Sequence, residues 1–193
     1  GATYAGGEPL ALSSMNRLNF ITTHSYEYVT TDSAASATAF ATGHKTHYQG
    51  VSVEAGTTAE QEEDPDHHLE TLLERAESRG WKTGLVANVR VTHATPAAFA
   101  AHRARRHSYR AIARDMSRSG VDVLLGGGRR YFTDRPDGAN LLEDMQAEGW
   151  RVARTADQIR AGAGVADQLV GLFGSKDLPP VQQRDRPMEL AEM

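Results

Sequence analysis

The feature that most constrains the fold is an alternation of helix-like and strand-like segments that begins at Leu69. Apolar residues recur with helical spacing over 69–76, and Gly80 follows where a helix would end. Residues 81–89 then form a short, largely apolar run that is typical of a strand. Because helices that connect such strands cover the faces of a parallel sheet, the pattern predicts an α/β fold with a mostly parallel central sheet.

The alternation continues to residue 173. Thr95 is expected to cap a helix over 95–104, because Pro96 would then occupy the first helical position. Further helices are expected over 109–116, between the cap Asn140 and Gly149, and after the capping box 155–158, with strands over 121–125, 150–153 and 167–173. Since no repeat or low-complexity linker interrupts this order, the chain is interpreted as one domain.

The composition excludes several classes of protein. Hydrophobic residues make up 39% of the chain and charged residues 24%, so a packed core is expected rather than disorder. The formal net charge of −4 argues against nucleic-acid binding, because nucleic-acid-binding domains usually carry a basic excess. The absence of cysteine excludes disulfides and thiolate metal sites, and no apolar run approaches the roughly 18 residues of a transmembrane helix.

The most reactive-looking segment surrounds Ser33. Residues 28–31 are β-prone and are expected to form a strand that leads into a helix beginning with Asp32 and Ser33 and ending at Gly43. The first N–H groups of a helix lack internal partners, so a phosphate is a natural guest there and the Ser33 hydroxyl would lie beside it. Ordinary helix capping explains the same residues equally well. No histidine lies close in sequence to act as base, and a serine without a base can be activated by a metal ion that lowers its pKa.

A second candidate segment begins at His93. If it lies at the carboxyl edge of the sheet, where ligands of α/β proteins bind, His93 and Thr95 are placed to contact a ligand. As plain alternatives, Thr95 is only a helix cap and His93 only a hydrogen-bonded surface residue. The arginines and histidines over 102–110 are expected for the most part to form a solvated basic helix face.

The serine segment resembles the signature of alkaline phosphatases. The match comprises Thr-Asp-Ser-Ala-Ala-Ser-Ala-Thr-Ala over 31–39, followed by Thr42-Gly43, Lys45-Thr46 and Gly50-Val51. The resemblance implies that Ser33 is the nucleophile, that it carries a phosphoseryl intermediate, and that it contacts an active-site zinc ion. It implies that Asp32 orients an arginine that binds the phosphate.

The second segment is similar to the part of the same family that serves the third metal site. The resemblance implies that Thr95 is a magnesium ligand. His93 stands where some members have aspartate, so it either binds metal or lies next to bound phosphate. Arg106 follows the Thr-Pro pair at the family's interval and precedes Tyr109 by three residues, which implies that it is the phosphate-binding arginine. If the register slips by one, Arg105 takes that role.

The family resemblance covers most of the chain but leaves parts of the enzyme unaccounted for. Zn²⁺ and Mg²⁺ are the implied cofactors, yet the upstream Asp-Gly block and the later blocks that hold zinc do not occur, so most zinc ligands are expected outside this chain. Residues 1–193 are therefore interpreted as a partial catalytic domain, truncated at both ends, with an incomplete three-layer α/β fold.

The resemblance implies phosphoric monoester hydrolysis through a phosphoserine on Ser33, in an isolated piece that is nearly inactive. Small-molecule phosphomonoesters are the implied substrates, and a periplasmic or extracellular homodimer is the implied full-length form. Two alternatives stay open: a relative that has lost catalysis, and a nucleotide-binding α/β module of another class. The nucleotide-binding module would need a glycine-rich turn after its first strand, and the glycines at 126–128 lack the spacing of the known motifs.

Overall fold

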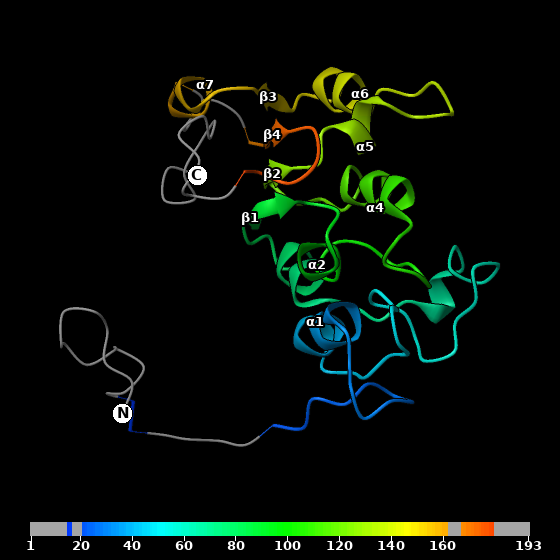
Figure 1. Cartoon of the computed structure of the whole chain (residues 1–193). Helices are drawn as coiled ribbons and strands as arrows, with labels where there is room; N and C mark the ends of the chain where they lie inside the picture. Colours follow the sequence, from blue (N-terminus) through cyan, green and yellow to red (C-terminus); the bar gives the residue numbers. More distant parts are fainter. Residues whose placement is uncertain (1–14, 17–20, 162–166, 180–193) are drawn as a thin grey trace.

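A four-stranded parallel sheet forms the centre of the molecule (Figure 1). The computed structural model describes residues 15–16, 21–161 and 167–179. The strands are β1 (Gly84–Arg90), β2 (Val123–Gly127), β3 (Arg151–Ala153) and β4 (Leu169–Gly174). They lie in the order β1-β2-β4-β3, and every neighbouring pair is parallel. The predicted α/β class with a parallel sheet is confirmed.

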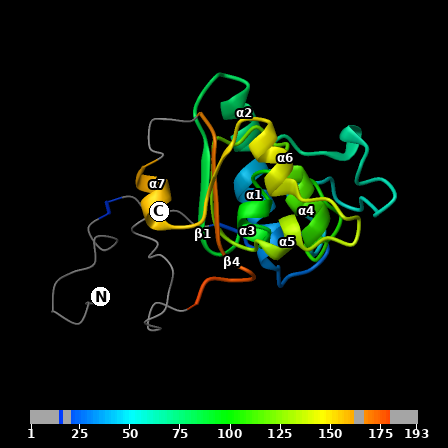
Figure 2. The ribbon, with the colours of Figure 1, turned by 90° about the horizontal axis from the view of Figure 1, so that it is seen from above.

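Helices cover both faces of this sheet, but unequally. The helices are α1 (Ser33–Thr42), α2 (Leu72–Glu77), α3 (Ala94–Ala97), α4 (Tyr109–Met116), α5 (Arg130–Thr133), α6 (Leu141–Ala147) and α7 (Ala156–Arg160), with a 3₁₀ turn, η2, at Pro65–His67. Figure 2 shows α1 to α6 on one side and α7 alone on the other. A large core fills the first side, whereas Leu125, Ala153 and Ile159 form a small cluster beneath α7. None of the helices in the described ranges combines the length and the hydropathy that a membrane crossing requires.

Two of the predicted helices form for different reasons, α2 through its cap and α4 through its apolar stripe, since Ser108 before α4 makes no side-chain cap hydrogen bond. At α2, Thr71 accepts a hydrogen bond from the Glu74 N–H while the Glu74 carboxylate accepts one from the Thr71 N–H, which is a complete capping box. In α4, Ile112, Ala113 and Met116 are buried on one face, as their spacing predicts. The stripe of α4 therefore faces the core as predicted, whereas α2 buries only Leu73 of its predicted stripe and leaves Leu72 57% exposed.

The predicted helix over 95–104 is wrong. Helix α3 covers only Ala94–Ala97, and its cap position is occupied by His93 rather than by Thr95. The chain then leaves the helix because Arg103 pairs with Val51, with each backbone N–H donating to the other's carbonyl at 2.9 Å. This tertiary pairing overrides the helix propensity of the alanine-rich segment.

The strand expected at 28–31 is also absent. The structure has bends over 26–30, and Val29 is 90% exposed. β-prone residues form a strand only where a neighbouring strand offers hydrogen bonds, and here the Ser25 N–H bonds locally to the carbonyl of Tyr28. Helix α1 therefore begins at Ser33 after a turn, with Asp32 as its cap rather than its first residue.

Glycines let the loop after β4 cross the end of β2. A Cβ atom at Gly127 would lie 2.2 Å from the carbonyl oxygen of Lys176, so no other residue fits there without moving that loop. The close approach brings Asp177 next to the end of β1, where it contacts Arg90. The carboxyl edge of the sheet thus carries a charged pair, with Arg90 from the end of β1 and Asp177 from the loop after β4.

Candidate functional site

The site is built around the start of helix α1. Asp32 caps the helix by accepting hydrogen bonds from the N–H groups of Ala34 and Ala35, each at 3.1 Å, and it accepts a third from Gln49 at 3.1 Å. Two of the N–H groups at the helix start that were expected to bind a phosphate therefore donate to the Asp32 carboxylate instead. The side chain of Ser33, one residue further, is exposed to solvent. Anion binding at this helix start consequently needs a donor from elsewhere in the chain.

Arg106 supplies that donor. Its Nη1 donates to the Asp32 carboxylate at 2.9 Å and to the Ser33 hydroxyl oxygen at 2.5 Å. Its Nη2 lies 3.4 Å from Nε2 of His93. The structure thus brings together four of the five site residues predicted from sequence, although they come from three separate segments. Their proposed roles stay predictions, whereas their proximity is a property of the fold.

Gln49, which was not predicted from the sequence, fixes the positions of both Asp32 and Arg106. Its N–H donates to Asp32, and its carbonyl accepts from the Arg106 N–H at 2.9 Å. The residue has a φ of 71°, a left-handed conformation that is uncommon for residues other than glycine. In that conformation the N–H and the carbonyl of one residue reach both halves of the ion pair. No sequence signal short of the fold itself identifies such a residue.

The charges of the site shift two pKa values downward. Burial raises the pKa of the Asp32 carboxyl, but the hydrogen bonds from Arg106 and from three backbone N–H groups outweigh it and lower the pKa overall. Burial, together with the positive charges of Arg106 and Arg90, lowers the pKa of His93. At neutral pH the Asp32–Arg106 ion pair is therefore intact and the imidazole of His93 is uncharged. Its Nε2 accepts the hydrogen bond from Arg106 and could bind a metal only in place of that bond.

Thr95 lies apart from this group. Its side chain is exposed, and within the described part of the chain no hydrogen bond joins it to Ser33 or Arg106. Together with His93 it lines a hollow of about 450 Å³ between α3 and the outer edge of β1. His93 is consequently the one predicted residue that touches both places: the arginine on one side and the hollow on the other.

Arg105, the alternative to Arg106, points elsewhere. It is exposed and lines a different hollow of about 510 Å³, whose walls include Tyr28, Tyr48 and Glu60. Among the described contacts, none joins Arg105 to Ser33. The geometry therefore favours the register in which Arg106 faces the serine.

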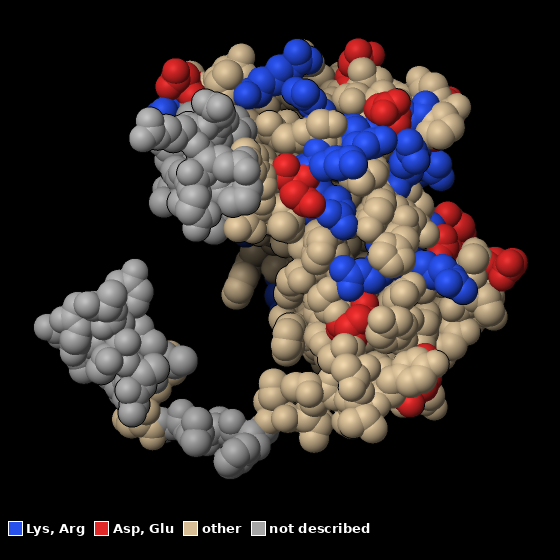
Figure 3. Space-filling model, in the orientation of Figure 1, with Lys and Arg blue, Asp and Glu red and all other residues tan. Residues whose placement is uncertain are grey.

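A second charged group beside the site was not predicted. Arg90 donates from Nη1 to both oxygens of Asp177 at 2.9 Å and from Nη2 to the hydroxyl of Tyr109 at 3.1 Å. The rule that α/β ligand sites lie beyond the carboxyl ends of strands points to Arg90, the last residue of β1, but not to Asp177. Other arginines are paired too, such as Arg135 with Asp137, and basic and acidic side chains alternate across the face in Figure 3.

The described residues offer single metal donors rather than a complete cage. Nowhere in the described ranges do three or more histidine or acidic side chains gather around one point that would hold a cation. Ser33, Thr95 and the neutral imidazole of His93 present oxygen and nitrogen atoms of the kinds that bind Zn²⁺ or Mg²⁺. Any cation here would need further ligands.

Comparison with known proteins identifies relatives over nearly the whole sequence. The family model for alkaline phosphatase matches residues 3–193. Alkaline phosphatase 4 of Bacillus subtilis is 34% identical over 165 residues, which cover 82% of this chain and 33% of the relative. Streptomycin-6-phosphate phosphatase of Streptomyces griseus is 35% identical, covering 77% of this chain and 36% of the relative. The chain therefore spans about a third of the length of these curated relatives.

Solved structures give the same result. Alkaline phosphatase from the Antarctic bacterium TAB5 superposes with a TM-score of 0.73 at 30% identity, over 86% of this chain and 46% of that one. The Thermus thermophilus alkaline phosphatase gives a TM-score of 0.77 at 31% identity, over 90% of this chain and 36% of that one. The sheet and its covering helices are thus shared with part of a larger structure.

Proposed function

We propose that this chain, which belongs to the alkaline phosphatase family, carries two parts of the active site of a phosphomonoesterase. These parts are the nucleophile, Ser33, and the phosphate-binding arginine, Arg106. One observation carries the proposal: an exposed serine hydroxyl lies 2.5 Å from a guanidinium that is itself held by a carboxylate. A guanidinium can bind two phosphate oxygens at once, which suits it to a phosphoryl group beside the serine.

In the proposed reaction, the Ser33 oxygen attacks phosphorus and the alcohol of the monoester leaves. Water then attacks the resulting phosphoserine, which releases inorganic phosphate and restores the hydroxyl. Arg106 stabilises the negative charge that spreads over the phosphoryl oxygens in both steps. Asp32 holds the guanidinium in place, and a substrate would displace the Arg106–Ser33 hydrogen bond while the Arg106–Asp32 pair persists.

Ser33 lacks a base among its described contacts, since its one partner there is the cationic donor Arg106. A bound zinc ion would lower the pKa of the hydroxyl and stabilise developing charge, while Mg²⁺ would be held in part by Thr95 and His93. Structures of TAB5 alkaline phosphatase variants, with a histidine replaced by glutamate or aspartate, hold magnesium in a site named M3. These structures support a metal-dependent reaction here. Most zinc ligands are proposed to lie outside residues 1–193.

The natural substrates are proposed to be small-molecule phosphomonoesters, as the name of the Streptomyces griseus relative suggests. Family resemblance also leads us to propose a homodimer in the periplasm or outside the cell. A relative that has lost catalysis remains the second candidate, because the described residues include no complete metal cage.

Turnover of p-nitrophenyl phosphate tests the proposal. The protein expressed from its complete reading frame, supplied with zinc and magnesium, is expected to hydrolyse the ester. Ser33→Ala should abolish this activity, whereas Ser36→Ala, a change on the same helix, should retain it. Residues 1–193 alone should be nearly inactive. An inactive complete protein that still binds zinc would favour the non-catalytic relative, and rapid turnover by residues 1–193 that is lost in Ser33→Ala would contradict their predicted inactivity.

A further inference from the structure

We propose that Arg103, whose guanidinium points into a cluster of carboxylates, is the positioning residue that holds Arg106 against Ser33. The effect of Arg103 on catalysis rests on the function proposed above, whereas its effect on the position of Arg106 does not. Arg103 is an exception to the solvated basic helix face predicted for most of the arginines and histidines over 102–110, because its side chain is only 3% exposed.

The segment that carries Arg106 has no regular structure to hold it. Residues 101–106 belong to neither a helix nor a strand apart from the isolated pairing of Arg103 with Val51. The backbone of Arg106 itself is fixed by one hydrogen bond, from its N–H to Gln49. An arginine at the end of such a segment needs further support if its guanidinium is to stay within hydrogen-bond distance of a serine.

Arg103 provides that support through three carboxylates. Its Nη1 lies 3.4 Å from Glu62 and 2.5 Å from Glu63, and its Nη2 donates to Asp115 in helix α4. One guanidinium therefore joins the loop before η2 to α4. Because three carboxylates surround it, removal of its charge would leave like charges facing one another, two of which, Glu62 and Asp115, are largely buried.

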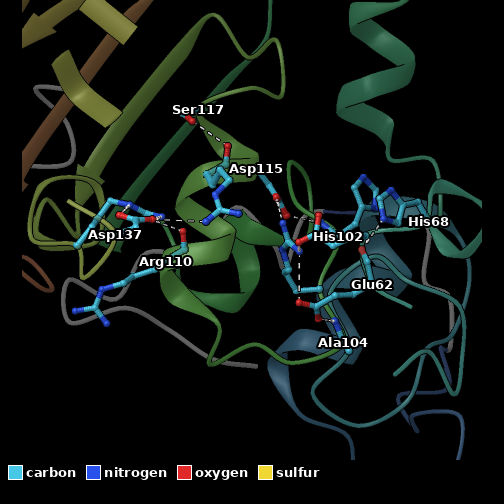
Figure 4. A network of polar contacts seen from close by, with 12 residues as sticks. Glu62, His68, His102, Ala104, Arg110, Asp115, Ser117 and Asp137 are labelled. Carbon is cyan, nitrogen blue, oxygen red and sulfur yellow. Dashed lines mark hydrogen bonds and ion pairs between the residues drawn. The ribbon is translucent and has the colours of Figure 1, made fainter. Parts of the chain in front are cut away.

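Two of these carboxylates also hold the backbone on either side of Arg103. Glu62 places one oxygen on Arg103 and the other on the N–H of Ala104 at 2.8 Å. Asp115 likewise uses one oxygen for Arg103 and the other for the N–H of His102 at 3.2 Å. Figure 4 shows Glu62 beside Ala104, and Asp115 with His102. The guanidinium thus orients the carboxylates that fix the chain immediately before Arg106.

A buried arginine elsewhere in the molecule provides a matched control. The Arg135 side chain is 2% exposed and binds Asp137 and two carbonyl groups, of Arg110 and Tyr131. It is as buried as Arg103 and is bonded through Nε as well as both Nη atoms, whereas the buried Nε of Arg103 has no partner among the described residues. Arg135 contacts none of the residues that hold Arg106. Lysine at either position keeps the charge and loses the planar fork.

The test compares Arg103→Lys with Arg135→Lys in the protein from its complete reading frame. At a temperature where both are folded, Arg103→Lys should raise the inhibition constant for inorganic phosphate and lower kcat/KM about tenfold each, while Arg135→Lys changes both less than about twofold. In an Arg106→Ala background, Arg103→Lys should have no further effect. An equal additional loss in that background would overturn the proposal.

Amide hydrogen exchange separates this proposal from the proposed function. Arg103→Lys should speed exchange at the Ala104 and Arg106 amides, and Arg135→Lys should not. If the complete protein has no Ser33-dependent activity, the proposed function fails and the exchange data still decide the role of Arg103. If Arg103→Lys does not fold, Glu62→Gln should give the same changes more weakly. Unchanged exchange in the folded variant would overturn the proposal.

Discussion

The two sides of the candidate site are built in different ways. On the Arg106 side, Asp32, Ser33 and the guanidinium form a closed set of hydrogen bonds, all from residues of this chain. On the Thr95 side, a single imidazole and an exposed hydroxyl line an open hollow at the edge of the sheet. The part that is proposed to bind phosphate is therefore contained in the described residues, whereas the part that would hold metal is only partly present there.

This difference indicates that phosphate binding and metal binding should respond separately to mutation. Changes on the Arg106 side should alter phosphate affinity at constant metal content. Changes on the Thr95 side should alter metal content first and phosphate affinity only through the metal. His93 contacts Arg106 and also lines the hollow with Thr95, so its variants show whether it acts on phosphate binding or on metal binding.

Arg106→Ala is expected to have the largest effect. Loss of a charged donor aimed at the transferred phosphoryl group should lower kcat/KM of the complete protein by roughly 10²–10³ with unchanged zinc and magnesium content. Steady-state kinetics and elemental analysis measure the two quantities. Arg105→Ala is the control and should change neither much; a larger loss from Arg105→Ala would show that the register is shifted by one.

His93→Asp should have an intermediate effect that falls on the metal. A carboxylate favours Mg²⁺ over the softer ions that imidazole binds well, so magnesium affinity should rise about tenfold relative to zinc. Magnesium titration of activity, with metal content measured in parallel, tests this. If metal preference stays constant and only phosphate affinity changes, His93 lies beside the phosphate and is not a ligand.

The smallest of the expected effects is the change in folding stability that Asp32→Asn produces. The folded-state pKa of Asp32 is lowered, so its contribution is present above the unfolded value near 3.8 and is lost as pH falls through the folded value. Wild type should exceed Asp32→Asn by about 1 kcal/mol in unfolding free energy at neutral pH, and the gap should close in acid. Urea titrations between pH 3 and 7 measure it. A gap for Asp32→Asn that stays constant with pH would contradict the ion-pair explanation.

Much of the fold was predictable because local signals and burial agree. The stripe of α4 and the capping box of α2 specify helices whose apolar faces match the sheet they cover. The contiguous apolar run of β2 predicts a strand buried on both faces, and its last four residues are buried. In each of these elements the residues that set the local conformation are also the residues that pack.

The errors arose where a distant partner determined the conformation. The alanine-rich segment after Thr95 has helix propensity, but Arg103 pairs with Val51, which lies 52 residues earlier, and the helix stops. The β-prone residues at 28–31 found no neighbouring strand. The burial of Arg103 was equally unpredictable, because its carboxylate partners come from a loop about 40 residues earlier and from helix α4.

The proximity of the predicted site residues was predictable only in part, through the family resemblance rather than through local chemistry. These residues are Ser33, Asp32, His93 and Arg106. Nothing in the local chemistry of Asp32 and Ser33 distinguishes a helix cap from a catalytic pair, and the capping interpretation is also correct for Asp32. The family resemblance supplied the link to Arg106, and the fold supplied the distances. Gln49 and Asp177 had no signal of either kind and emerged only from the structure.

The most direct test of the account is to locate the covalent phosphate. The protein from its complete reading frame is mixed with a phosphomonoester, quenched in acid, digested and examined by mass spectrometry. The account predicts a phosphate on Ser33 that disappears in Ser33→Ala and persists in Ser36→Ala. A phosphate that remains in Ser33→Ala, or that lies on another residue of the wild type, would contradict it.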